Sequence, residues 1–312
     1  MKLSLNLLFL LLCGLACAGC EEEDIIQKKK TYDYQSEVAQ LVADSSGIVS
    51  EVFTDTAFTV VPGVEQIEMH FLDMRGYTTR LFIQRIDLNT PGLSLEVGTP
   101  YDLPSYGSSQ TVAEMARYAD KPGHRVVGGV NGDFYDISNF VPRGPLHKNG
   151  EIIKDRFTPT AALPQQALSF FGILNDGKPH IGYTREYENY KSRLTEATGG
   201  GVLLMKDSRV VDNSQFPQID PRIAIGYTAE NIIYFVVVDG RKFHYSNGMS
   251  YEYLSKLFRS LDVHSALNLD GGGSSTMMIY NALGGVWQMR NQSSDGKARA
   301  VSNAWLVISD QP

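Results

Sequence analysis

Cysteine is scarce in this sequence: there are three among 312 residues, and all lie within the first twenty positions. After Cys20 no thiol is available for a disulfide, a nucleophile or a Cys-ligated metal site. A secreted eukaryotic enzyme of this length would ordinarily carry disulfides. The lack of cysteine therefore favours a protein of the bacterial cell envelope.

Blocks of positive charge are also missing, apart from the short run of residues 28–30, and the net charge is −7. Nucleic-acid phosphates require a broad positive footprint, so we expect no nucleic-acid partner. The apolar run near the start is too short to span a bilayer comfortably. A hydrophobic fraction of 43% and a charged fraction of 20% are typical of a soluble globular protein.

Residues 1–20 have the pattern of a signal peptide, in which Lys2 precedes the apolar stretch LSLNLLFLLLCGLACAG. The letters CAGC followed by EEED resemble a lipobox with Cys20 as the lipidated first residue, and the acids resemble a surface-export signal. We therefore expect an outer-membrane lipoprotein, exposed at the cell surface and attached to the membrane only through its lipid anchor. An ordinary cleaved signal peptide, or lipidation at Cys17, remains an alternative.

The chain after Cys20 divides into a polar tether, residues 21–46, and one domain, residues 47–312. SEVAQLVADS, at the end of the tether, could make one short helix. Alternating apolar residues between turn signals predict strands, including hairpins that turn at residues 175–177 and 228–231. TVAEMARYAD and MSYEYLSKLFRSLDV have helical spacing. We predict an α+β fold, dominated by antiparallel or mixed β-sheet with a few helices.

Several common catalytic templates are missing. The GGSST stretch around Ser274 lacks the closing glycine of a GxSxG elbow, no lysine follows the glycines as in a P-loop, and there is no HExxH. The six histidines are scattered singly. The sequence therefore disfavours a zinc hydrolase and a serine-triad hydrolase.

What the chain does contain is a set of predicted strand ends that finish in polar residues beside glycine, where a rigid scaffold commonly holds functional loops. One Asp-Gly or Asn-Gly pair usually marks a simple turn. Three successive glycines after an acid, as in NLDGGGSS, exceed what a turn requires. The candidate site residues are Asn131, Asp133, Arg222, Asp239, Asp270, Gly271, Gly272, Gly273, Ser274, Ser275, Arg299 and Asn303.

Seven stretches in chain order together resemble the phosphodiester glycosidase family over about residues 128–304. They are GGVNGDFYD, PRGPLHKNGEII, GGGVLLMKD, PRIAIGYT, VVVDGR, ALNLDGGGSSTM and RAVSNAW, of which NLDGGGSS is the most specific. The resemblance implies hydrolysis of the anomeric C–O bond of a sugar-1-phosphodiester, which releases the sugar and leaves a phosphomonoester.

This reaction gives the acids possible roles, since a carboxylate can stabilise or attack the oxocarbenium-like centre that forms at the anomeric carbon. Asp133 and Asp270 are the leading pair for nucleophile or base and proton donor. Asp239 is either a third member or a group that orients an arginine. Arg222 and Arg299 suit the phosphate because a guanidinium offers a planar, bidentate donor fork.

Residues 271–273 could let backbone N–H groups approach an anion or sugar closely. Contacts to sugar hydroxyls are expected from Asn131, Asn303, Ser274 and Ser275. No cofactor and no resident metal are expected, although the clustered aspartates could hold Ca²⁺ or Mg²⁺. Two other functions remain open: a glycan-binding lipoprotein without catalysis, and a glycosidase whose glycan substrate carries no phosphate.

Overall fold

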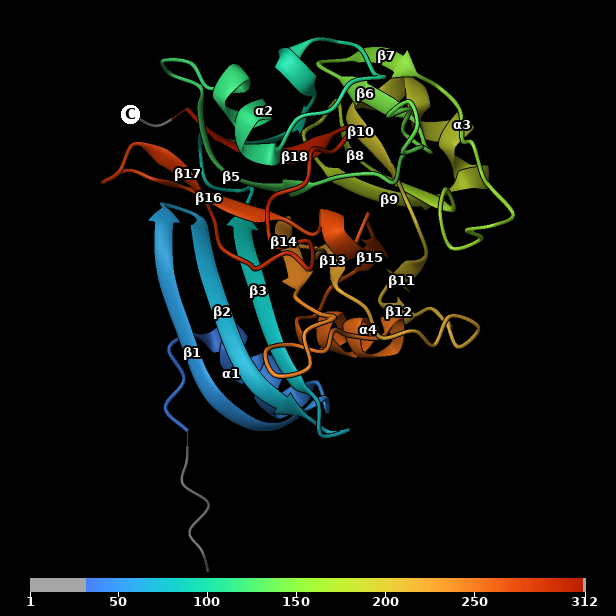
Figure 1. Ribbon diagram of the computed structural model, residues 1–312. Coiled ribbons are helices and arrows are strands. Elements are labelled where there is room, and N and C mark those ends of the chain that lie inside the picture. The colour runs from blue at the N-terminus through green and yellow to red at the C-terminus, as the bar shows by residue number, and fades with distance from the viewer. Residues whose placement is uncertain (1–31, 311–312) are drawn as a thin grey trace, which may run out of the picture. The chain divides into compact units, whose positions relative to one another are not determined.

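The domain is built from three β-sheets in which every recorded strand pair is antiparallel (Figure 1). A computed structural model describes residues 32–310. The predicted signal peptide, Cys20 and most of the tether lie outside the described residues. The α+β class dominated by β-sheet is confirmed.

The largest sheet has eight strands and supplies one half of the candidate site. Their order is β1 (Val49–Val61), β2 (Val64–Asp73), β3 (Thr78–Asp87), β14 (Ile232–Val238), β13 (Arg222–Tyr227), β15 (Ser265–Asn268), β11 (Leu203–Lys206) and β12 (Arg209–Val210). The hairpin expected around residues 228–231 is confirmed as β13 and β14.

Two five-stranded sheets complete the fold. One has the order β17 (Val286–Met289), β16 (Met277–Asn281), β5 (Arg125–Asn131), β18 (Ala304–Ser309) and β4 (Leu93–Gly98). The other has the order β7 (Glu151–Lys154), β6 (Leu146–Lys148), β10 (Leu194–Gly200), β8 (Ser169–Leu174) and β9 (Pro179–Tyr183). The β8–β9 hairpin confirms the turn expected at residues 175–177.

The helices are short and mostly begin at a side chain that caps them. They are α1 (Glu37–Ser45), α2 (Val112–Ala119), α3 (Tyr187–Tyr190), α4 (Tyr251–Ser260) and the 3₁₀ turns η1 (Pro100–Asp102), η2 (Thr184–Glu186), η3 (Lys191–Arg193) and η4 (Gly272–Ser274). Thr111 forms a capping box with Glu114 at the start of α2, and Ser250 caps α4 by accepting from the Tyr253 amide.

Helix α1 belongs to the packed domain, although its sequence was expected within the tether. Its apolar face buries Val38, Ala39 and Val42 in the core that β2, β3 and α4 share. In Figure 1 it lies behind the long strands β1–β3. The apolar residues of this amphipathic helix thus pack against one face of the large sheet.

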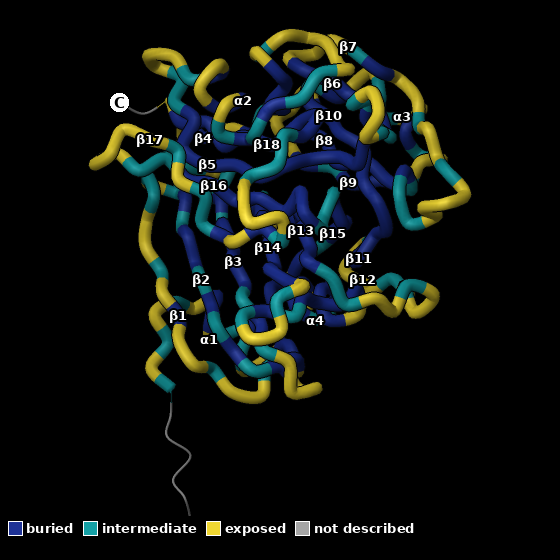
Figure 2. Tube along the Cα trace, in the orientation of Figure 1, coloured by how far each residue is buried: buried dark blue, intermediate teal, exposed yellow. Residues whose placement is uncertain are grey.

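Antiparallel pairing brings the candidate site residues together, because the end of one strand lies beside the start of its neighbour. Asn131 at the end of β5 pairs with Ala304 at the start of β18, and Ala224 near the start of β13 pairs with Asn268 at the end of β15. The strands themselves are buried, whereas the outer loops are exposed (Figure 2). The polar residues that follow or precede these strands therefore converge at the junction of two sheets.

Candidate active site

A cavity of about 230 Å³ opens where these strand ends meet. Its lining residues come mainly from the segments around β13, β15 and η4. They are Phe134, Gln165, Asp220, Pro221, Arg222, Arg241, Tyr251, Asn268, Asp270, Gly271, Gly272, Gly273 and Arg299. Five residues of the predicted set of acids, glycines and arginines thus share the cavity with Arg222.

Asp270 is the predicted acid that lines this cavity, and its backbone is fixed from both sides. Its N–H donates to the Gly132 carbonyl at 3.0 Å, and its carbonyl accepts from Nδ2 of Asn131 at 2.7 Å. Oδ1 of Asn131 accepts in turn from the Thr276 amide. Asn131 is 1% exposed, so it joins the two loops and offers no open face to a sugar hydroxyl.

The carboxyl group of Asp270 is poised to exchange a proton near neutral pH. Burial raises the pKa of Asp270 to about 7, against the hydrogen bond from Ser274 and the positive charge of Arg299, which both lower it. Ser274 also accepts from Nη1 of Arg299 at 3.2 Å. A group with such a pKa can act as an acid or as a base at physiological pH.

Asp133 is not among the residues that line the cavity and is only 2% exposed. Its amide donates to Oδ1 of Asn303, and its Oδ2 accepts from the Gly144 amide at 2.6 Å. Its Oδ1 has no hydrogen-bond partner within residues 32–310. Asn303 therefore positions Asp133 through its backbone amide. The sequence had suggested a contact between Asn303 and a sugar hydroxyl instead.

The electrostatics of Asp133 connect it to Asp270. Burial raises the pKa of Asp133 to about 7, while the Gly144 amide and the charge of Lys154 lower it and the charge of Asp270 raises it. The charge of Asp270 therefore adds to the larger effect of burial on Asp133, whereas Asp270 is shifted mainly by its own burial. Of the two acids, Asp270 lines the cavity.

The glycine triplet is required mainly for close packing. A Cβ on Gly273 would lie 2.1 Å from Nη2 of Arg299, and one on Gly271 would lie 2.6 Å from the Pro221 carbonyl oxygen. The Gly272 amide already donates to that same carbonyl at 2.9 Å. The backbone nest expected here is therefore not open at Gly272, and the missing side chains serve to admit Arg299 and the start of β13.

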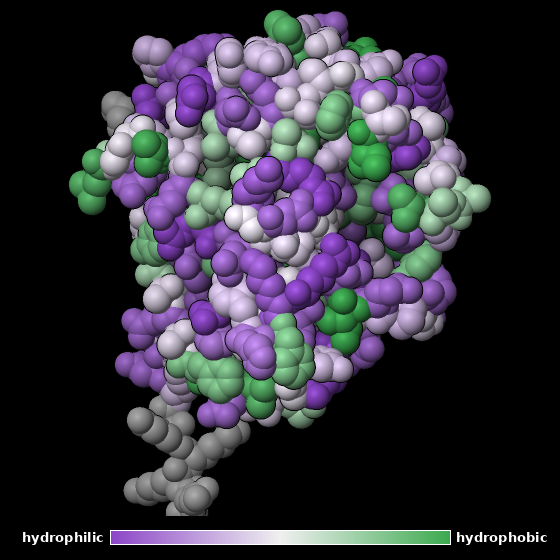
Figure 3. All heavy atoms as spheres, in the orientation of Figure 1, coloured by the Kyte–Doolittle hydropathy of each residue, from purple (hydrophilic) through white to green (hydrophobic). Residues whose placement is uncertain are grey.

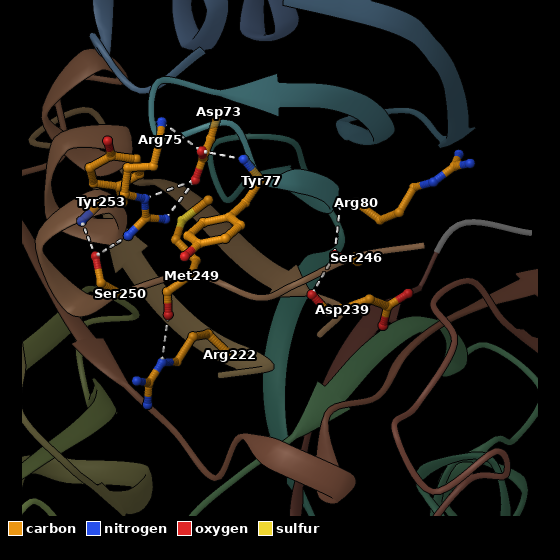
Figure 4. Close-up of polar contacts among 10 residues, drawn as sticks. All are labelled: Asp73, Arg75, Tyr77, Arg80, Arg222, Asp239, Ser246, Met249, Ser250 and Tyr253. Carbon is orange, nitrogen blue, oxygen red and sulfur yellow. Dashed lines mark hydrogen bonds and ion pairs between the residues drawn. The ribbon is translucent and has the colours of Figure 1, made fainter. Parts of the chain in front are cut away.

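Arg222 lines the cavity, but its guanidinium is committed to the protein. Nε donates to the Met249 carbonyl at 2.9 Å and Nη2 to the Gln218 carbonyl, while the guanidinium lies 3.9 Å from the centre of the Tyr251 ring. Figure 4 shows the side chain directed toward Met249. Burial lowers the pKa of Arg222. Arg222 therefore mainly fixes the start of β13 to the neighbouring backbone.

Asp239 does not line the cavity. One carboxylate oxygen accepts from Nδ2 of Asn291, and the other accepts from the Gln292 amide and the Tyr245 hydroxyl. In Figure 4 the carboxylate points away from Arg222. Through these hydrogen bonds Asp239 connects the end of β14 to the segment after β17. Its carboxylate makes no hydrogen bond or ion pair with Arg222, Arg241 or Arg299.

The two predicted serines are both 0% exposed but differ in their contacts. The Ser274 hydroxyl lies between Asp270 and Arg299, as described above, whereas the Ser275 hydroxyl has no partner within residues 32–310. The Ser275 carbonyl accepts from Nδ2 of Asn291. Ser274 therefore tunes the acid, and Ser275 belongs to the packing beneath the turn.

Sequence reasoning missed other cavity residues, above all Arg241 and its partner Asp220, with Tyr251 and Gln165. The stretch VVVDGR ends in Arg241, and Asp220 directly precedes PRIAIGYT, but nothing in their spacing showed that the two side chains would meet. Among the described residues, no group of three or more His, Cys, Asp or Glu side chains is arranged to hold a metal ion.

Comparisons with known proteins converge on one family. The model of the phosphodiester glycosidase family matches residues 124–308. The catalytic domain of zebrafish N-acetylglucosamine-1-phosphodiester alpha-N-acetylglucosaminidase, auto-inhibited by its pro-peptide, has a similar fold with a TM-score of 0.61 at 19% identity, over 83% of this chain and 88% of that one. A hypothetical protein from Synechocystis has a TM-score of 0.57 at 16% identity, over 82% of this chain and 64% of that one.

A curated relative is more similar in sequence but longer. The SPbeta prophage-derived uncharacterized protein YomE of Bacillus subtilis is 28% identical over 178 residues, which is 54% of this chain. The match covers 26% of the relative, so this chain spans about a quarter of the length of that protein.

Proposed function

Because the chain belongs to the phosphodiester glycosidase family, we propose that it hydrolyses the anomeric C–O bond of sugar-1-phosphodiesters. Water adds to the anomeric carbon, the C–O bond breaks, and its electron pair leaves with the phosphate oxygen. The products are the free sugar and a phosphomonoester. The zebrafish enzyme of similar fold is named for an N-acetylglucosamine 1-phosphodiester, so this sugar is the first to test.

The observation that carries the proposal is the presence of Asp270 with the exposed guanidinium groups of Arg241 and Arg299 in one cavity. The ionised Asp270 can stabilise or attack the positive charge that develops at the anomeric carbon. The phosphate leaves as a stable anion and needs cationic donors more than a proton. Asp270 is linked to Arg299 through the Ser274 hydroxyl, which sets the acid beside a donor for that anion.

The two acids with raised pKa values favour catalysis over simple glycan binding. Asp133 and Asp270 both have pKa values raised to about 7, which means that the folded protein holds each carboxylate at a cost in free energy. Strongly raised carboxyl pKa values cluster at catalytic sites, where proton transfer near neutral pH uses them. The arginines likewise favour a substrate that contains phosphate.

We also propose that the protein is anchored in the bacterial outer membrane through lipid on Cys20. The lipobox-like CAGC and the acids that follow it support this location. Within residues 32–310, no helix is long and apolar enough to cross a membrane. The face of the domain in Figure 3 is largely hydrophilic, with small scattered hydrophobic areas.

The test is turnover of the methyl diester of α-N-acetylglucosamine 1-phosphate, with its β anomer and other sugars as a panel. The wild-type chain should release sugar and methyl phosphate in equal amounts. Asp270→Asn preserves the shape of the side chain but removes its charge, so it should lower the rate by about 10²- to 10³-fold. Equal rates for the two proteins would remove Asp270 from the mechanism, and no turnover of any diester would count against the function.

A further inference from the structure

Arg241 and Arg299 line the cavity and are anchored in the same way. Nε and Nη2 of Arg241 each lie 3.0 Å from Oδ1 of Asp220. Nε and Nη2 of Arg299 lie 2.8 and 2.7 Å from Oδ2 of Asp295. In both, one carboxylate fixes one edge of the guanidinium and leaves the Nη1 side for another partner. A matched pair of oriented donor groups therefore faces the cavity.

Both guanidinium groups reach the glycine turn. The terminal nitrogens of Arg241 lie 3.4 and 3.5 Å from the position that a Cβ on Gly272 would take, and Nη2 of Arg299 lies 2.1 Å from the same position on Gly273. Nη1 of Arg299 donates to Ser274, whereas Nη1 of Arg241 makes no hydrogen bond within residues 32–310. The two arginines thus approach adjacent glycines, and Nη1 of Arg241 remains available as a hydrogen-bond donor.

Accessibility separates these two arginines from Arg222. The side chains of Arg241 and Arg299 are 52% and 39% exposed, whereas that of Arg222 is 8% exposed. In Arg222, Nε and Nη2 donate to backbone carbonyls and the guanidinium stacks on Tyr251. A ligand that entered the cavity would meet Nη1 of Arg241 and the exposed guanidinium of Arg299 before it met Arg222.

We infer that Arg241 and Arg299 form a clamp that holds the phosphate group of the substrate at the Gly272–Gly273 turn, and that Arg222 is a positioning residue. This inference rests on the proposed function. Asp220 and Asp295 balance the two positive charges, so the clamp selects phosphate through directed N–H donors more than through net charge. A phosphodiester carries a single negative charge and suits donors that are already partly neutralised.

The clamp is tested with Arg241→Lys and its matched control Arg222→Lys, because lysine keeps the charge but cannot reproduce a bidentate fork. Each full-length variant is assayed on the methyl diester of α-N-acetylglucosamine 1-phosphate and on 4-nitrophenyl α-N-acetylglucosaminide. Arg241→Lys should lower kcat/KM by roughly ten- to a hundredfold on the diester, with little change on the aryl glycoside. Arg222→Lys should affect both substrates alike.

Binding of methyl phosphate, measured by calorimetry, gives a second readout that needs no turnover. Its affinity should fall in Arg241→Lys and persist in Arg222→Lys, with thermal midpoints that show both variants to be folded. A selective loss in Arg222→Lys, or no loss in Arg241→Lys, overturns the clamp while the proposed function stands. If wild type binds methyl phosphate through Arg241 yet cleaves no diester, the clamp stands and the function fails; if it does neither, both fail.

Discussion

Replacement of Asp133 by Asn should make the folded protein more stable at alkaline pH. The carboxyl of Asp133 is 2% exposed, and its Oδ1 has no hydrogen-bond partner within residues 32–310. Its pKa is about 7 in the folded chain against an ordinary value of 3.8. At about 1.36 kcal/mol per pKa unit, the folded state gives up about 4 kcal/mol when this group ionises.

The sign follows from proton binding. Between pH 4 and 7 the folded state keeps the proton that the unfolded state has lost, so the contribution of Asp133 to stability falls as pH rises, and it is constant above pH 7. Asn does not titrate, so this slope disappears in the variant. An unpaired amide N–H in place of Oδ1 costs about 1–3 kcal/mol, which leaves a net gain of about 1–3 kcal/mol above pH 7.

The assay is denaturant unfolding of wild type and Asp133→Asn from pH 4.5 to 8.5. The comparison variant is Asp239→Asn: burial raises the pKa of this acid too, but both of its oxygens accept hydrogen bonds from Asn291, Gln292 or Tyr245, which an amide would partly lose. Asp239→Asn should destabilise the fold by about 1–3 kcal/mol. If Asp133→Asn is destabilised by the same amount at pH 5 and at pH 8, the claim that Asp133 is a strained buried acid is refuted.

Two further predictions concern the charge near Asp133 and the membrane anchor. The charge of Lys154 lowers the pKa of Asp133, and Nζ of Lys154 donates to the Gly144 carbonyl. In Lys154→Met the limb of the pH–rate profile that depends on Asp133 should therefore shift to higher pH. An unchanged profile would assign Lys154 to the fold alone. Cys20→Ala should release soluble protein or leave an unprocessed precursor, and metabolic lipid labelling that persists in this variant would contradict the anchor.

Local chemistry made much of the fold predictable. The hairpins at residues 175–177 and 228–231 and the helix behind Thr111 follow from turn residues, apolar alternation and a capping box that act within a few positions. The long strand β1 was not predicted, and the partition of strands into three sheets could not be, because distant pairings depend on tertiary packing. The same limit explains why α1 was placed in the tether.

The sequence predicted which strand ends carry the polar residues of the site, but it did not predict which of these residues contact one another. Asp270, the glycine turn and Arg299 do share a cavity. The sequence left Asp239 as a third acid or a group that orients an arginine, yet its carboxylate accepts hydrogen bonds from Asn291 and Gln292, more than fifty positions away. Arg241 was overlooked because its orientation depends on Asp220, whose neighbourhood arises only in the folded chain.

The central claim is cleavage of the anomeric C–O bond, and hydrolysis in H₂¹⁸O tests it most directly. Wild-type protein is incubated with the methyl diester of α-N-acetylglucosamine 1-phosphate, and the phosphate product is analysed by mass spectrometry. The label should be read on phosphorus, because the anomeric oxygen of a free sugar exchanges with water. Attack at carbon predicts methyl phosphate without ¹⁸O. Methyl phosphate or sugar phosphate that contains ¹⁸O would show attack at phosphorus and contradict the proposed reaction.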